Sequence, residues 1–135
     1  MVIGVDTVKE IDTLEAAYDD ALGVTAAFNL NVLKHINRVL LSDFATQDWR
    51  HTALFNEQES RIEMHLVAKR KTRVSWPGGE RKFRENESIL TEYSYKWLPE
   101  DFTELLKKAG FSEVEVWTDP HQWFAVYRAQ VRNPA

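Results

Sequence analysis

Residues 99–131 read PEDFTELLKKAGFSEVEVWTDPHQWFAVYRAQV, and this stretch decides the fold at one end of the chain. Pro99 suits the first turn of a helix, and Gly110 suits the position just after its end. Apolar residues recur between them at helical spacing, at Phe102, Leu105, Leu106 and Ala109. The pattern therefore predicts an amphipathic helix that begins at Pro99.

Three strands are predicted around this helix. Two of them, over 111–117 and 122–131, form a hairpin turned at Asp119-Pro120. The last strand carries apolar residues on both faces, which is typical of a strand buried on two sides. The third is the short apolar run Val2–Val5, which ends at Asp6 and predicts another buried strand.

The segment after Asp6 predicts two helices. The D-x-x-E spacing from Asp12 to Glu15 indicates a capped helix start, and Gly23 breaks the apolar pattern that follows. Thr25 is predicted to cap the second helix. That helix contains three asparagines despite their poor helix propensity, which indicates polar roles for some of them: Asn29, Asn31 and Asn37.

Apolar residues then alternate with a period of two, which predicts antiparallel strands. Pro77-Gly78-Gly79 marks a tight turn between strands over 73–76 and 80–84. A longer strand is predicted over 88–97. Strict alternation places Ile89, Thr91, Tyr93 and Tyr95 on one of its faces, and Leu90, Glu92, Ser94 and Lys96 on the other.

The composition is that of one globular unit or part of a larger one. The 135 residues are 44% hydrophobic and 28% charged, with a net charge of −4. The absence of cysteine excludes disulfides, thiolate metal sites and cysteine nucleophiles. With neither a signal peptide nor an apolar run of about 20 residues, a cytoplasmic location and no membrane partner are expected.

Standard catalytic and metal motifs are missing. The four histidines have no metal-ligand spacing, so no metal is expected, and there is no glycine-rich phosphate loop. The basic run Lys69–Arg73 is interpreted as a charged hairpin rather than a nucleic-acid patch, because the chain is acidic overall.

Glu92 and Ser94 are the informative pair. Two residues apart on a strand, their side chains point the same way, about 6.6 Å apart along the chain. A carboxylate and a hydroxyl so placed can hold a small heterocycle, whereas the alternative is a solvated strand face. Tyr18 is either a pocket residue or a core tyrosine with its hydroxyl at the rim. Met64, on an apolar strand face, is interpreted as core.

The chain resembles the histidine-specific, S-adenosylmethionine-dependent methyltransferases. The matching blocks occur in order over nearly the whole chain: Gly4-Val5-Asp6, Ala17-Tyr18-Asp19-Asp20, Gly23-Val24-Thr25-Ala26-Ala27-Phe28-Asn29, Arg61-Ile62-Glu63-Met64, Thr91-Glu92-Tyr93-Ser94-Tyr95-Lys96 and Trp117-Thr118-Asp119. The resemblance covers only the C-terminal part of the family's enzymes.

The resemblance implies an α/β fold, or α+β in isolation. Residues 1–9 and 98–135 would be the C-terminal part of a Rossmann-like methyltransferase core, and 10–97 a substrate-binding insertion. S-adenosylmethionine would serve the parent enzyme. It is not expected to bind this chain alone, because the first four strands and their glycine-rich turn are absent.

The family's substrate residues carry over one by one. Tyr18 would address the carboxylate of the amino acid, with Thr25 helping nearby. Glu92 and Ser94 would bind the imidazole, and Met64 would pack beside the ring. The implied reaction is methylation of the α-amine of L-histidine to the trimethyl betaine. None of these residues is expected to be catalytic, and this chain is expected to be inactive alone.

Two other functions stay open at this point. A stand-alone, non-catalytic module could bind an amino acid without chemistry, and an interaction domain would have no amino-acid affinity. The open apolar edge of the strand over 2–6 also predicts association, either as a homo-oligomer or with a missing N-terminal half.

Overall fold

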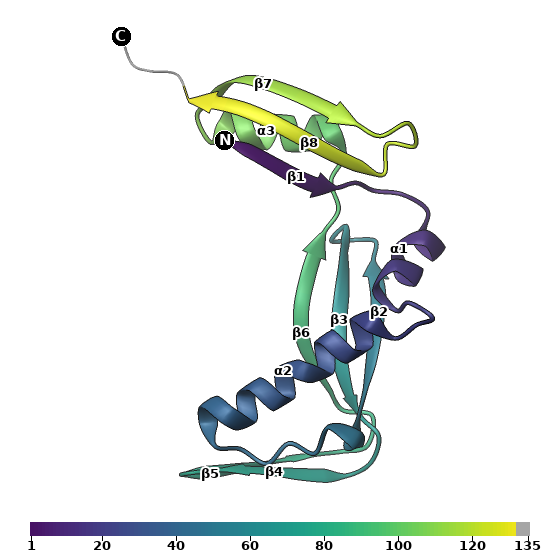
Figure 1. Cartoon of the computed structure of the whole chain (residues 1–135), viewed down its shortest axis with the longest axis vertical. Coiled ribbons are helices and arrows are strands. Elements are labelled where there is room, and N and C mark those ends of the chain that lie inside the picture. The colour runs from purple at the N-terminus through teal and green to yellow at the C-terminus, as the bar shows by residue number, and fades with distance from the viewer. Residues whose placement is uncertain (132–135) are drawn as a thin grey trace. The chain divides into compact units, whose positions relative to one another are not determined.

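The computed structural model describes residues 1–131 and divides the chain into two compact units (Figure 1). Unit 1 comprises Met1–Glu10, Glu57–Arg61 and the described part of Tyr95–Ala135. Unit 2 comprises Ile11–Asn56 and Ile62–Ser94. No helix in the described part is long and apolar enough to cross a membrane. The division into a methyltransferase core and a substrate insertion stays a prediction.

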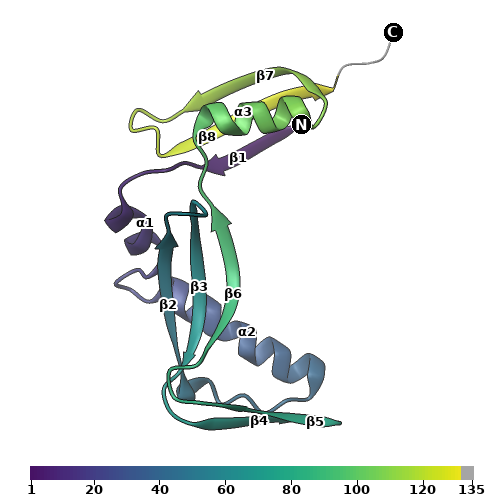
Figure 2. The same ribbon diagram turned by 180° about the vertical axis from the view of Figure 1, so that it is seen from behind.

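Unit 2 is a three-stranded sheet with helices on one face and a two-stranded hairpin beyond it. Its sheet has the order β2-β3-β6, and β4 pairs antiparallel with β5. Figures 1 and 2 show α2 crossing one face of the sheet. The elements are α1 (Ile11–Tyr18), α2 (Val24–Leu40), η1 (Thr46–Asp48), β2 (Trp49–Asn56), β3 (Arg61–Ala68), β4 (Thr72–Trp76), β5 (Gly79–Phe83) and β6 (Ser88–Tyr95).

The core of unit 2 lies between the helices and the sheet. Alternate residues of β3, namely Ile62, Met64, Leu66 and Ala68, are all buried, so one strand face supplies a continuous apolar row. Leu14 of α1 packs at one end of this row and Leu33 of α2 at the other. Both helices therefore cover the same face of the sheet.

Unit 1 is a three-stranded antiparallel sheet covered by one helix. The sheet has the order β1-β8-β7, and α3 contributes Phe102 and Leu106 to the core against alternate residues of β8. Its elements are β1 (Val2–Asp6), α3 (Pro99–Lys108), β7 (Phe111–Thr118) and β8 (Phe124–Val131). The predicted helix at Pro99, its glycine end at Gly110 and the final hairpin are confirmed.

The predicted burial of the strands in unit 1 is partly wrong. On β8, Ala125, Tyr127 and Ala129 are buried, but Phe124 and Val126 on the opposite face are exposed. The reason is that, within residues 1–131, α3 packs on the face that carries Ala125, Tyr127 and Ala129 and leaves the other face without a helix. β1 lies at the sheet edge and buries only Val5, so the open edge is present, while association through it stays a prediction.

Both predicted helix caps are also wrong. α1 begins at Ile11, before Asp12, so Asp12 lies inside the helix and is not its cap. The Glu15 carboxylate instead accepts a hydrogen bond from the backbone N–H of Phe55, at 3.0 Å. Thr25 lies inside the first turn of α2 and is not its cap. A tertiary contact with β2 thus uses the Glu15 side chain that the local pattern assigned to capping.

Candidate functional site

The structure brings three of the five predicted site residues together. The hydroxyl of Tyr18, the last residue of α1, lies 2.7 Å from the hydroxyl of Ser94 on β6. Tyr18 also packs against the buried cluster that contains Met64. A phenol, an alcohol and a thioether from three separate elements are therefore neighbours on the helix-covered side of the sheet.

Thr25 lies apart from this set of contacts, in the first turn of α2, where it bonds to the loop that follows α1. The backbone N–H groups of Thr25 and Val24 donate to the two carboxylate oxygens of Asp20, at 2.8 and 2.9 Å. These bonds satisfy amides at the start of α2 that have no partner within the helix. They stabilise the ionised carboxyl and lower the pKa of Asp20 to about 2.

We expect Asp20→Asn to destabilise the chain in a pH-dependent way. Because the pKa of Asp20 is lower in the folded chain than when unfolded, its stabilisation is complete above the unfolded pKa of about 3.9. It is lost as the pH falls toward 2. Urea denaturation of wild type and Asp20→Asn at several pH values should show a higher free energy of unfolding for wild type at pH 7. This difference should disappear in acid. A difference independent of pH would contradict the role of the charge.

The predicted face assignment along β6 is wrong in one respect. Ile89 packs against the cluster that contains Leu33, and Ser94 contacts Tyr18 on the same helix-covered side. Ile89 and Ser94 are five positions apart, so strict alternation would put them on opposite faces. Glu92 and Tyr93 are both exposed, which marks the break in alternation. That Glu92 shares a face with Ser94 stays a prediction.

Sequence reasoning missed a half-buried histidine at this site. His51 of β2 lies between Asn29 and the backbone carbonyl of Tyr18, within hydrogen-bonding distance of both. The sequence signal that could have pointed to this contact was Asn29, because an asparagine inside a helix indicates a polar partner. The expected polar roles are confirmed for Asn29 and for Asn37, whose side chain bonds both the N–H and the carbonyl of Phe44.

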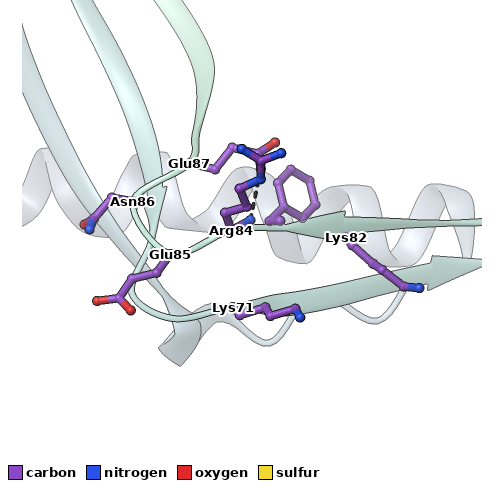
Figure 3. A pocket seen from close by; sticks show the side chains of 7 residues that line it. Lys71, Lys82, Arg84, Glu85, Asn86 and Glu87 are labelled. Atoms are coloured by element: carbon purple, nitrogen blue, oxygen red, sulfur yellow. Dashed lines mark hydrogen bonds between the residues drawn. The ribbon is translucent and has the colours of Figure 1, made fainter.

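One hollow in unit 2 lies elsewhere and is lined by none of the predicted site residues. It has a volume of about 930 Å³ and is lined by Lys71, Lys82, Phe83, Arg84, Glu85, Asn86 and Glu87 (Figure 3). Two of its charged side chains, Lys82 and Glu87, pair with neighbouring residues of opposite charge. Glu87 accepts from the backbone N–H of Arg84 at 2.9 Å and pairs with Arg81 at 3.1 Å. This pairing supports the interpretation of a solvated, charged hairpin.

The fold is therefore of the mixed α+β class, with a cluster of polar side chains on the helix-covered face of its larger sheet. A model of the family described as "Histidine-specific methyltransferase, SAM-dependent" matches residues 1–131. The chain belongs to this family.

Characterised relatives are similar over most of this chain. It is 44% identical over 122 residues to the histidine N-alpha-methyltransferase of Mycolicibacterium smegmatis, and 41% identical over 121 residues to that of Mycobacterium tuberculosis. These matches cover 89% and 88% of this chain, but only 38% of each relative. Ergothioneine biosynthesis protein 1 of Neurospora crassa is 31% identical over 87% of this chain and 13% of its own length.

Proposed function

We propose that this chain is the substrate-binding and C-terminal part of a methyltransferase that acts on the α-amine of L-histidine. The observation that carries the proposal is the 2.7 Å contact between Tyr18 and Ser94 beside Met64, in a member of the histidine-specific family. These are three of the residues that the family resemblance assigns to the amino acid.

The chemistry of these side chains suits histidine. The Ser94 hydroxyl can donate or accept, so it can serve either imidazole nitrogen, and the carboxylate of Glu92 accepts from a ring N–H. The Tyr18 hydroxyl donates to the substrate carboxylate. The contact between Tyr18 and Ser94 would then open to admit the substrate between them. With ring and carboxylate held, the α-amine is the polar group left free.

The chain's own residues contribute orientation. S-adenosylmethionine, when bound in such an enzyme, supplies the electrophilic methyl group. Methyl transfer to nitrogen needs a free amine lone pair in line with the reacting bond, and holding reactants in this geometry removes several kcal/mol from the barrier. Tyr18, Glu92 and Ser94 would fix the amine in that direction. Repeated transfer would give the trimethyl betaine.

The described residues do not fit a cofactor site of their own. A nucleoside-binding loop needs glycines in a turn between a strand and a helix. Gly4 lies within β1, Gly23 precedes α2 in a helix-to-helix loop, Gly78 and Gly79 turn the β4–β5 hairpin, and Gly110 joins α3 to β7. We propose that the cofactor site belongs to the part of the relatives that this chain does not span.

Unit 1 is proposed to be the end of the methyltransferase sheet. β1 and β7 both run antiparallel to β8, so they are parallel to each other, and α3 leads into β7. Parallel strands joined through a helix are the repeating element of Rossmann-like sheets. This arrangement supports the assignment of residues 1–9 and 98–135 to that core, with 10–97 as the insertion.

A chimera tests the proposed reaction. This chain would replace the matching segment of the Mycolicibacterium smegmatis relative, which is 38% of that protein. We expect the chimera to convert L-histidine to its Nα-methylated products, detected by mass spectrometry. The control is binding of S-adenosylhomocysteine, which reports a folded cofactor site. A chimera that binds both this compound and histidine without methylation would favour the non-catalytic amino-acid-binding module.

A further inference from the structure

The C-terminal end of α1 is held by a partly buried polar network. The carbonyl oxygen of Tyr18 lies 2.7 Å from Nε2 of His51, and Nδ1 of the same ring lies 2.9 Å from Nδ2 of Asn29. Asn29 is only 1% exposed, and its Nδ2 also donates to the backbone carbonyl of His65, at 3.3 Å. The network therefore joins α1, α2, β2 and β3 at one point.

The donors and acceptors of this network fix one form of the histidine. A backbone carbonyl can only accept, so the bond to His65 orients Asn29 with its NH₂ group inward. That NH₂ group can only donate, which makes Nδ1 of His51 the acceptor. The ring proton must then be on Nε2, from which it is donated to the carbonyl of Tyr18. His51 is neutral in this arrangement.

The hydrogen bond from His51 to the Tyr18 carbonyl is important because α1 is too short to fix the position of its own C-terminal end. α1 has eight residues, well below the length at which an isolated helix is stable, and the last carbonyls of a helix have no partner inside it. The position of the Tyr18 phenol follows from its backbone through only two side-chain torsions. Loss of the His51 bond would therefore let the phenol move away from Ser94.

We propose that His51, held as its Nε2–H form by Asn29, is a positioning residue for the Tyr18 hydroxyl. The inference rests on the proposed function, in which Tyr18 addresses the substrate carboxylate. His51 touches no substrate atom in this account. It acts through the backbone of Tyr18, and so sets where the carboxylate of the amino acid is held relative to Ser94.

Nuclear magnetic resonance of the whole 135-residue chain tests the positioning without any ligand. Nitrogen-15 shifts should show His51 as the Nε2–H form. With ¹³Cζ-labelled tyrosine, Tyr18→Phe assigns the Tyr18 resonance, and Ser94→Ala gives its position without the Ser94 contact. We expect His51→Phe to move this resonance toward the Ser94→Ala position. We expect His51→Gln, whose amide keeps an N–H donor, to restore it.

Controls separate positioning from folding. His35→Phe, at an exposed site on α2, should leave the Tyr18 resonance unchanged. If His51→Phe fails to fold, two measurements still test the proposal. They are the protonated nitrogen of His51 in the wild type and the Tyr18 resonance in His51→Gln. An Nδ1–H form of His51 would overturn the proposal. So would a Tyr18 resonance that His51→Phe leaves in place in a folded chain.

Calorimetric titration with L-histidine connects the network to the proposed function. The loss of one hydrogen bond predicts a Kd up to about tenfold higher for His51→Phe, with His51→Gln close to wild type. Wild-type binding that His51→Phe leaves unchanged overturns the inference alone. A wild-type chain that shows the expected resonances but binds no histidine contradicts the proposed function, and leaves the positioning of Tyr18 established by the spectra.

Discussion

Replacing Asp6 by Asn is expected to lower the free energy of unfolding by about 1.5–3 kcal/mol, the usual contribution of a hydrogen bond between charged groups. The Asp6 carboxylate at the end of β1 lies 2.8 Å from the ammonium group of Lys96, whose side chain is 0% exposed. Lys9 pairs with the other carboxylate oxygen. The variant would remove this negative charge from beside a buried ammonium and leave a neutral amide in its place.

The same pair predicts sensitivity to acid. Burial raises the pKa of Asp6, but hydrogen bonds and attraction from Lys9 and Lys96 outweigh it, so the net pKa is lowered. A carboxyl whose pKa is lowered by folding stabilises the chain above its unfolded pKa of about 3.9, and the stabilisation is lost as the pH falls below it. The difference in the free energy of unfolding between wild type and Asp6→Asn should therefore become smaller at acidic pH.

Urea denaturation at pH 7 and at acidic pH measures both effects. The matched control is Glu104→Gln, which breaks an exposed pair with Lys108 on α3. Such exposed helix pairs contribute less than about 1 kcal/mol. If Asp6→Asn lowered the free energy of unfolding at pH 7 by no more than Glu104→Gln does, the pair between Asp6 and Lys96 would not contribute substantially to the stability of unit 1.

Glu92→Ala is expected to weaken binding of L-histidine by about 1–3 kcal/mol, which corresponds to roughly five- to 150-fold in Kd. Glu92 lies two residues before Ser94 on β6, and it is exposed. Its carboxylate is therefore available to accept a charge-assisted hydrogen bond from an imidazole N–H. Because the residue is exposed, the substitution should change the stability of the free chain by less than about 0.5 kcal/mol.

Calorimetry on the variant and on one control tests this assignment. Glu85→Ala removes an exposed carboxylate of the same unit in the hollow beside the β4–β5 hairpin, and histidine affinity should not respond. Glu92→Gln keeps the shape of the side chain and loses the charge, so its affinity should fall between those of Glu92→Ala and wild type. Equal affinity in wild type and Glu92→Ala would contradict the role of the carboxylate.

The sequence predicted correctly those elements whose ends are marked by residues within the element itself. The helix at Pro99 carries its own start, apolar stripe and glycine end, and Pro77-Gly78-Gly79 specifies the β4–β5 turn. Asn29 was expected to have a polar role because asparagine is a poor helix former, and it is buried and hydrogen-bonded.

Features that depend on distant residues could not be predicted in this way. Asp20 binds the first amides of α2 from a position outside the expected cap, and Glu15 bonds to β2. The break in alternation near Glu92 has no glycine or proline to mark it. The two-sided apolar pattern of β8 does not reveal that α3 covers only one face. His51 lies next to Tyr18 only because α1 packs on β2.

We propose that this chain holds the residues that bind histidine, while the cofactor site lies outside it. The most direct test is calorimetric titration of the purified chain with L-histidine and with S-adenosylhomocysteine, separately and together. We predict saturable heat from L-histidine that Ser94→Ala diminishes, and none from S-adenosylhomocysteine alone. Saturable binding of S-adenosylhomocysteine to this chain, or no binding of L-histidine, would contradict the account.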